Sequence, residues 1–213
     1  MSSDRDVAAF DRRAASYDEG RLGAWHEDIV LKVSAVVQRA APEVVHAVVD
    51  VGCGTGLLLA QLRARLGAQV RLLGIDPAPG MVAQAARRAQ GRFDVAVGAA
   101  EALPIPDGSV DVAVACLSFD HWADQEAGLK ECARVLRPGG TLVVADLFAA
   151  WLGVTTIAGR SRRRVRTPRV MQSLCVRAGL EPLVWQQLQR AGFLPIIQVI
   201  VADRPVPDWM RTR

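Results

Sequence analysis

A short glycine-rich stretch constrains this chain more than any other feature of its sequence. Residues 48–56 are Val-Val-Asp-Val-Gly-Cys-Gly-Thr-Gly, and residues 57–66 follow with leucines at helical spacing. The pattern predicts a buried strand that ends in a tight turn and leads directly into a helix. Glycine adopts backbone dihedrals that a Cβ disfavours, and the first turn of a helix offers unpaired N–H groups. We therefore expect a polar ligand here; a glycine turn that merely joins strand to helix is the alternative.

A carboxylate closes each of the first two predicted strands. Asp50 ends the first, and Asp76, twenty residues after Gly56, ends the second. A carboxylate at this second position can accept hydrogen bonds from both hydroxyls of a ribose. Capping of the helix from Pro77 is an alternative role that does not exclude the first. The Gly-x-Gly-x-Gly spacing differs from the G-x-G-x-x-G of dinucleotide sites, and no G-x-x-x-x-G-K-[ST] loop is present, which disfavours pyrophosphate-binding and NTPase sites.

Strand-like apolar runs alternate with helical stripes along the rest of the chain. We expect strands at 44–51, 70–75, 93–97, 110–117, 141–146, 182–188 and 194–202. Helices are expected around 29–40, 57–66 and 81–89, between Asp124 and a stop at Pro138-Gly139-Gly140, and from Pro168 after a Thr167 cap. The last two strands must pair antiparallel because their connection is short. This order predicts an α/β Rossmann-like doubly wound sandwich, with a seven-stranded, mostly parallel sheet and an antiparallel C-terminal edge hairpin.

Length and composition set broad limits. A chain of 213 residues with 51% apolar residues and a net charge of +4 is typical of one globular domain. The four cysteines form no CxxC pair and show no metal-ligand spacing, so we expect reduced thiols and no metal site. The N-terminal residues include no apolar signal region, and no uncharged apolar run is long enough to span a bilayer. We therefore expect a cytoplasmic protein; its oligomeric state stays open.

Polar side chains gather at the carboxyl ends of the predicted strands. In a doubly wound sheet, ligands bind at this edge, where the winding of the strands reverses. The residues concerned are Asp50, Asp76, Glu101, Asp120, His121 and Asp146. Their convergence is stronger evidence for a site than any one of them.

Several motifs in the same order resemble class I S-adenosylmethionine-dependent methyltransferases, and in particular the methyltransferase type 11 group with its ubiquinone- and menaquinone-biosynthesis-like enzymes. They are residues 48–56, 74–76, 101–104, 107–111 and 133–140. The resemblance covers roughly residues 10–146. It implies an S-adenosyl-L-methionine cofactor and in-line methyl transfer to an oxygen, nitrogen or carbon of a small-molecule acceptor. There are two alternatives. One is a nicotinamide-dependent oxidoreductase, against which the glycine spacing argues, and the other is a non-catalytic cofactor-binding module.

The resemblance also implies which residues hold the cofactor. Asp50 and the backbone of Gly52, Cys53 and Gly54 would hold the methionine moiety, and Asp76 would hold the ribose. The adenine would contact Pro77, Met81, Ala100 and Glu101, and the opposite wall would be formed by Cys116 and Leu117. Tyr17 would close over the cofactor. Tyr17 alternatively anchors a surface loop. Many relatives carry an acid where this chain has Ala99, which implies weaker adenine contacts or contacts by the backbone alone.

His121, with Asp120 beside it, is the best candidate for a catalytic base. The cofactor supplies the electrophile, so the protein chiefly aligns the acceptor, and an oxygen or nitrogen acceptor can also need a base. The alternative for His121 is a loop residue that caps the next helix. His26 is a weaker candidate for the base, and His46 is expected to have no role. A group of apolar side chains also indicates an acceptor pocket: Phe119, Trp122, Phe148, Trp151 and Leu152. The alternative is that these side chains pack the edge of the sheet.

Arginines crowd the segment after the fifth strand, at Arg160, Arg162, Arg163, Arg164, Arg166 and Arg169. They predict recognition of an anionic acceptor or a membrane surface, unless the segment is simply solvated. No aromatic residues are interleaved with them, so nucleic acid is not expected as a partner.

We expect a single methyltransferase domain over 1–213: a helical cap at 1–42, a cofactor-binding core at 43–146, an arginine-rich insert at 147–167, and a helix and hairpin at 168–213.

Overall fold

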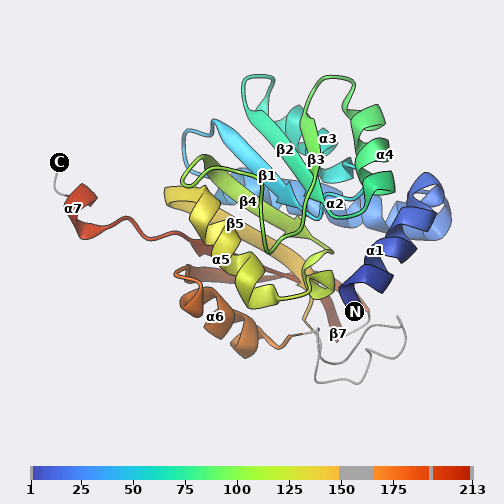
Figure 1. Cartoon of the computed structure of the whole chain (residues 1–213). Helices are drawn as coiled ribbons and strands as arrows, with labels where there is room; N and C mark the ends of the chain where they lie inside the picture. The colour runs from blue at the N-terminus through green and yellow to red at the C-terminus, as the bar shows by residue number, and fades with distance from the viewer. Residues whose placement is uncertain (1, 149–165, 192–193, 212–213) are drawn as a thin grey trace.

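One seven-stranded sheet organises the computed structural model, which describes residues 2–148, 166–191 and 194–211 (Figure 1). The strands are β1 (Ala47–Val51), β2 (Arg71–Asp76), β3 (Asp94–Val97), β4 (Val110–Cys116), β5 (Leu136–Leu147), β6 (Glu181–Ala191) and β7 (Leu194–Asp203). Their order is β3-β2-β1-β4-β5-β7-β6. The first five strands pair in parallel, whereas β7 pairs antiparallel with both β5 and β6. The predicted fold class, including the antiparallel C-terminal hairpin, is confirmed.

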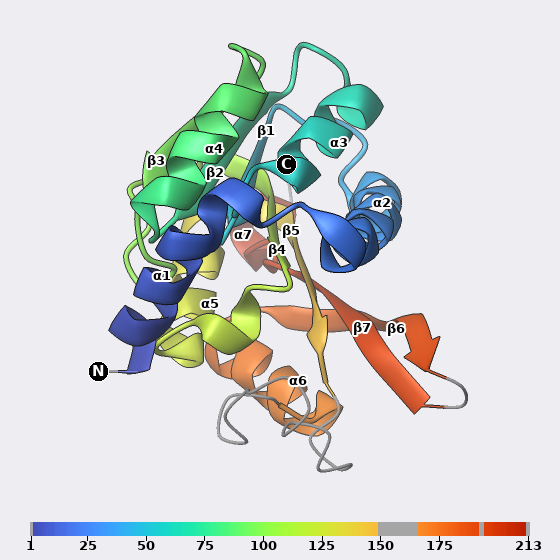
Figure 2. The same ribbon diagram turned by 90° about the vertical axis from the view of Figure 1, so that its right-hand side faces the viewer.

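Helices cover both faces of this sheet (Figure 2). They are α1 (Ser2–Arg13), α2 (Gly20–Ala40), α3 (Leu57–Leu66), α4 (Pro79–Ala89), α5 (Gln125–Val135), α6 (Pro168–Arg177) and α7 (Asp208–Arg211), with short 3-10 turns η1 (Ala14–Ser16) and η2 (Phe119–His121). Alternate strand residues point to opposite faces. Val48 therefore packs with α2 and α3, and Val49 and Val51 pack with α5 and α6. Within the described ranges, no helix combines the length and the apolar character that a membrane span requires.

The glycines after α5 correct one prediction. Helix α5 ends at Val135, and β5 begins at once and includes Pro138-Gly139-Gly140, which was expected to be the stop signal. The N–H of Gly139 donates to the carbonyl of Arg204, and the N–H of Arg204 donates to the carbonyl of Gly140, each at 2.8 Å. Pairing with the chain just beyond β7 thus extends the strand. The predicted bounds differ most at α2, which begins at Gly20 rather than at 29. In the sheet, β1 begins at Ala47 rather than at 44, and both hairpin strands are longer.

Two predicted helix caps are confirmed. The Asp124 carboxylate accepts from the N–H groups of Glu126 and Ala127 at 3.0 and 3.1 Å. The Thr167 hydroxyl accepts from the N–H of Val170 at 3.3 Å. Each cap satisfies donors that the first turn of a helix leaves unpaired, so α5 and α6 begin where the sequence pattern places them.

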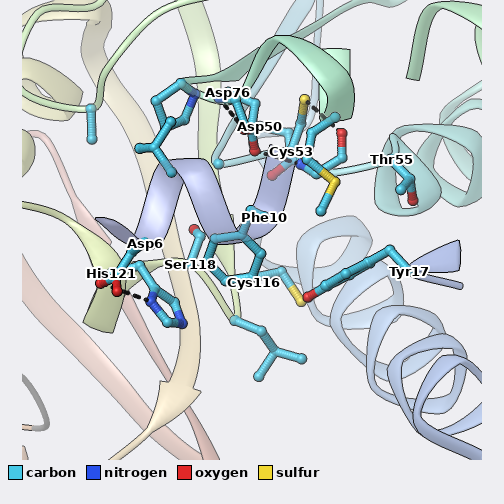
Figure 3. Close-up of a pocket in the computed structure, with 18 of the residues that line it drawn as sticks. Asp6, Phe10, Tyr17, Asp50, Cys53, Thr55, Asp76, Cys116, Ser118 and His121 are labelled. Atoms are coloured by element: carbon cyan, nitrogen blue, oxygen red, sulfur yellow. Dashed lines mark hydrogen bonds and ion pairs between the residues drawn. The ribbon is translucent and has the colours of Figure 1, made fainter. Parts of the chain in front are cut away.

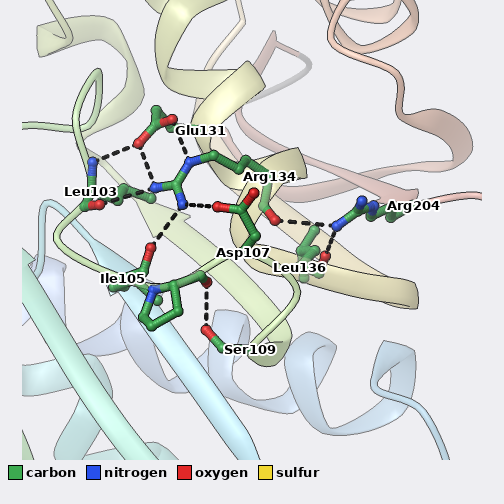
Figure 4. A network of polar contacts seen from close by, with 9 residues as sticks. Leu103, Ile105, Asp107, Ser109, Glu131, Arg134, Leu136 and Arg204 are labelled. Carbon is green, nitrogen blue, oxygen red and sulfur yellow. Dashed lines mark hydrogen bonds and ion pairs between the residues drawn. The ribbon is translucent and has the colours of Figure 1, made fainter.

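Arg134 on α5 anchors the loop between β3 and β4 (Figure 4). Its guanidinium pairs with the carboxylates of Asp107 and Glu131 at 2.6 and 2.7 Å. It also donates to the carbonyls of Leu103 and Ile105 at 3.0 and 2.8 Å. Because charge-assisted bonds of a planar guanidinium are strong and directional, this loop has a fixed path, and its first residues line the cavity described next.

Candidate active site

A cavity of about 550 Å³ lies at the carboxyl ends of β1 and β4 (Figure 3). The winding of the sheet reverses between these strands, since β2 and β3 lie on one side and β5 on the other. All twelve residues that the resemblance assigns to the cofactor line the cavity: Tyr17, Asp50, Gly52, Cys53, Gly54, Asp76, Pro77, Met81, Ala100, Glu101, Cys116 and Leu117. Segments far apart in the sequence therefore meet at one place. The roles of these residues as ligands stay a prediction.

The glycine turn is packed between the ends of β2 and β4. Gly52 has a φ of +79°, and a Cβ at this position would stand 2.4 Å from the Cβ of Ser118, just after β4. The N–H groups of Gly52 and Cys53 donate to the carbonyl of Ile75 at 2.7 and 3.1 Å. Glycine is required at position 52 for both reasons, the left-handed backbone and the close approach.

Asp76 supports this turn through both carboxylate oxygens. Its Oδ2 accepts from the N–H of Gly54 and its Oδ1 from the N–H of Ala78, both at 2.9 Å. Helix α4 begins at Pro79 with Ala78 at the N-cap, so the alternative of Asp76 as the cap of a helix from Pro77 is wrong. Burial raises the pKa of Asp76, and the two N–H donors oppose that rise. A carboxylate has lone pairs for more than two donors, which leaves capacity for ligand hydroxyls.

Asp50 is a buried carboxyl group with one oxygen that lacks a hydrogen bond. Its exposed fraction is 2%, and its Oδ1 accepts no hydrogen bond from the residues that the structure describes. Burial, and next the charge of Asp76, raise the pKa of Asp50 to about 8. A cation beside Asp50 would stabilise the ionised carboxylate and satisfy this oxygen. The base of the cavity is therefore suited to a ligand that carries positive charge.

The raised pKa of Asp50 predicts that the ligand-free protein loses stability as the pH rises. This carboxyl ionises near pH 3.8 in the unfolded chain and at about pH 8 in the folded one, so between these values the folded state binds more protons. The free energy of unfolding then falls with increasing pH. We expect Asp50→Asn to increase the free energy of unfolding at pH 8 by about 2 kcal/mol, which raises the melting temperature by roughly 4–8 °C. At pH 4 the substitution should change the melting temperature little. Thermal denaturation across this range tests the prediction; a constant difference between the two proteins would contradict it.

The N-terminal segment covers one side of the cavity. Phe10 on α1 and Tyr17 just after η1 both line it. Asp18 pairs with Arg88 on α4 at 2.7 Å and accepts from the hydroxyl of Thr55 in the glycine turn at 3.0 Å. These contacts tie the segment to both α4 and the turn. Tyr17 therefore lies where the resemblance places it, and its closing over the cofactor stays a prediction.

His121 lines another part of the cavity and lies between two carboxylates. Its Nε2 is 3.4 Å from an oxygen of Asp120, and its Nδ1 is 3.7 Å from an oxygen of Asp6. Asp120 itself is buried, and its backbone N–H donates to Asp146 at 3.1 Å. Asp124, not His121, caps α5, so the alternative role of His121 as a helix cap is wrong. An imidazole flanked by carboxylates is suited to accept a proton from a bound molecule.

Part of the predicted apolar acceptor pocket belongs to the core. Phe119 and Phe148 are buried in the core on the α5 side of the sheet, with their ring centroids 6.3 Å apart. For these two residues the alternative, packing of the sheet, is correct, because α5 and α6 cover this face. Trp122 lines the cavity. Trp151 and Leu152 lie outside the described residues.

The arginine-rich segment is described only at its end. Arg160, Arg162, Arg163 and Arg164 lie outside the described residues. Arg166 donates to the side-chain oxygen of Gln125, and Arg169 is exposed on α6. Recognition of an anion by this segment stays a prediction.

Sequence reasoning missed several residues that line the cavity: Asp6, Phe10, Thr55 and Ser118. Asp6 and Phe10 lie on a helix that no motif marks, and their position depends on how that helix packs. Ser118 had one available signal, since it directly follows the predicted wall residues Cys116 and Leu117. Of the other histidines, His26 lines the cavity, whereas His46 does not.

Comparison with known proteins identifies the family. Residues 49–144 match the family model described as a methyltransferase domain. The malonyl-[acyl-carrier protein] O-methyltransferase of Serratia marcescens is 32% identical over 146 residues, which are 68% of this chain and 54% of that protein. This stretch of the chain is a methyltransferase domain, of the kind found in S-adenosylmethionine-dependent methyltransferases. This family assignment makes S-adenosyl-L-methionine the cofactor and favours the methyltransferase over the oxidoreductase alternative.

Other members of the family support the assignment. The demethylmenaquinone methyltransferase of Thermus thermophilus is 43% identical over 103 residues, 46% of each protein. A solved S-adenosylmethionine-dependent methyltransferase from Thermotoga maritima, described as a possible histamine N-methyltransferase, has a TM-score of 0.72 and 25% identity, covering 92% of this chain and 97% of that one. The chain spans about half the length of each of these two curated relatives.

Proposed function

We propose that this methyltransferase transfers a methyl group from S-adenosyl-L-methionine to a small-molecule acceptor bound in the same cavity. Asp50 carries the proposal, because its buried carboxyl group, with one oxygen lacking a hydrogen bond, lines the cavity next to the glycine turn. The cofactor supplies an electrophilic methyl group on a cationic sulfonium, and its ammonium group is also cationic. The residues present therefore fit this cofactor.

The proposed roles of the lining residues are those that the family resemblance implies. Asp50 and the backbone of residues 52–54 hold the methionine moiety, and Asp76 accepts hydrogen bonds from the ribose hydroxyls. The adenine lies among Pro77, Met81, Ala100 and Glu101, and Cys116 and Leu117 form the opposite wall. With Ala99 in place of an acid, adenine binding relies on the backbone and on apolar contact. The N-terminal segment excludes water from the cavity.

The proposed catalytic group is His121. The protein aligns the acceptor within the cavity, and His121 accepts the proton that an oxygen or nitrogen acceptor loses. Asp120 orients the imidazole from its buried position at 3.4 Å. The name of one relative gives demethylmenaquinone, a small molecule, as its acceptor, which supports this acceptor class. The name of the other gives a malonyl group linked to an acyl-carrier protein.

The proposal extends to the organisation of the chain. Residues 1–213 act as one domain, with 1–42 as the cap and 43–146 as the cofactor-binding core. We place the protein in the cytoplasm, where its four cysteines, all free, stay reduced. Nucleic acid is not a proposed partner.

Calorimetry tests the cofactor site directly. We expect saturable 1:1 binding of S-adenosylmethionine and S-adenosylhomocysteine, and no competition by NAD. Incubation with methyl-labelled cofactor and a pool of small metabolites then identifies the acceptor by its mass increase. Binding of NAD without a response to either sulfur compound would contradict the proposal, and cofactor binding without transfer to any acceptor would favour the non-catalytic module.

A further inference from the structure

Among the residues that the structure describes, the cavity lining includes six carboxyl groups and no lysine or arginine. The six are Asp6, Asp11, Asp18, Asp50, Asp76 and Glu101. Two arginines approach the N-terminal segment without lining the cavity. Arg88 pairs with Asp18, and Arg13 lies 5.7 Å from the ring centre of Tyr17. An anionic acceptor would therefore lose hydration without gaining a cationic partner from these residues, which is unfavourable.

Each of the six carboxyl groups has a neighbour in the structure or a proposed role. Asp11 accepts from the N–H of Gly80 at 2.5 Å, and Asp18 pairs with Arg88. The proposed function gives Asp50, Asp76 and Glu101 to the cofactor. The sixth, Asp6, lies beside His121, the proposed base, and its side chain is 37% exposed.

Asp6 and His121 form a site apart from the carboxylates of the strand ends. In Figure 3 they lie together beside Phe10, whereas Asp50 and Asp76 lie in another part of the cavity near Cys53. The rings of Phe10 and His121 are nearly perpendicular, with centroids 4.9 Å apart. The acceptor side of the cavity thus combines an acid with aromatic surface.

Aromatic rings continue from this point along the N-terminal side of the cavity. Phe10 and Tyr17 have centroids 6.0 Å apart, and Tyr17 and His26 have centroids 4.9 Å apart. Val30 and Leu57 add apolar side chains to the lining. Such a surface accommodates an apolar body, and the faces of aromatic rings attract cations.

We infer that the acceptor is a basic amine with an apolar body, bound with its nitrogen toward Asp6 and His121. The inference rests on the function proposed above and specifies its acceptor class. Asp6 supplies the negative charge that an ammonium group needs, and the rings from Phe10 to His26 supply the apolar surface. A bound ammonium must lose a proton before its nitrogen has a lone pair. His121 accepts that proton at an imidazole nitrogen, and the N–H bond of the amine breaks as the imidazole N–H forms.

Two matched cofactor analogues test the charge of the acceptor side. Each is an adenosyl amino acid with nitrogen in place of sulfur, and each carries an arm where the transferred methyl group stands. One arm is 3-aminopropyl, and the other is 2-carboxyethyl. We expect the amine analogue to bind the wild-type protein at least about tenfold more tightly, since its arm meets Asp6 rather than a cation. Asp6→Asn should bring the two dissociation constants close together, and Glu27→Gln, which removes an exposed acid outside the lining, should leave their ratio unchanged.

The outcomes separate this inference from the proposed function. Equal binding of the two analogues, or tighter binding of the carboxylate, overturns the inference and leaves the methyltransferase proposal intact. A ratio that Asp6→Asn does not change overturns the assignment of the amine to Asp6. Rejection of both analogues by a protein that binds S-adenosylhomocysteine also overturns the inference. Failure to bind S-adenosylhomocysteine itself contradicts the proposed function, and the inference falls with it.

Discussion

Replacement of His121 by alanine is expected to lower the turnover number by about 10²–10⁴-fold, the range for removal of a general base. The dissociation constant of S-adenosylhomocysteine should change little, because His121 lies with Asp6 and Asp120 and not with the strand-end acids Asp50 and Asp76. The measurement is single-turnover methyl transfer to the acceptor found in the metabolite pool, together with calorimetry of cofactor binding.

Two further variants sharpen this test. His46→Ala removes an exposed imidazole outside the cavity and should retain wild-type turnover. Asp120→Asn should lower turnover less than His121→Ala and shift the pH profile, because Asp120 acts through the orientation of the imidazole. Full activity of His121→Ala would show that alignment of the acceptor suffices without a base.

Replacement of Asp76 by alanine is expected to weaken cofactor binding about tenfold to a hundredfold. The reason is that charge-assisted hydrogen bonds to the ribose contribute roughly 1.5–3 kcal/mol to the binding free energy, which the variant loses. The structure adds a second effect, since the N–H groups of Gly54 and Ala78 lose their acceptor. The melting temperature should therefore fall as well. Calorimetry with S-adenosylhomocysteine and thermal denaturation measure the two effects separately.

Asp94 provides the matched control for Asp76. It is an exposed aspartate at the start of β3, next to β2, and it does not line the cavity. Asp94→Ala removes the same charge and should leave cofactor affinity unchanged. An unchanged dissociation constant in a folded Asp76→Ala protein would limit Asp76 to support of the glycine turn.

Most of the sheet could be predicted from the sequence because its signals are local. A parallel strand buried on both faces is a short apolar run, and the loops that end these runs carry glycine, proline and aspartate. The exception is Pro138-Gly139-Gly140, which has the composition of a stop signal and lies in β5. Its pairing with Arg204, more than sixty residues away, is a contact that no local pattern encodes.

The cofactor side of the site followed from the same local signals. Asp50 and Asp76 lie at the ends of β1 and β2, and Glu101 lies in the loop after β3. Parallel strands present their carboxyl ends at one edge of the sheet. Once the order of the elements was known, these residues had to lie near one another. Eleven of the twelve predicted lining residues share one cavity for this reason, and Tyr17 reaches it through the packing of the N-terminal segment.

The acceptor side needed the folded chain. Phe119 and Phe148 look like pocket residues in sequence, and their burial depends on which face α5 and α6 cover. Asp6 and Phe10 line the cavity and reach His121 because α1 packs against α4. An isolated twelve-residue helix does not encode where it docks.

The sequence alone determined the α/β class, the antiparallel hairpin, the glycine turn and the acids at the strand ends. The reason is that strand periodicity, glycine dihedrals and the parallel sheet edge are set by neighbouring residues. Tertiary structure alone decided the unsatisfied oxygen of Asp50, the raised pKa of its carboxyl group, and the carboxylate of Asp6 beside His121. Burial, electrostatic coupling and the docking of α1 are properties of groups brought together from distant segments, and their energies depend on distances that only the packed chain defines.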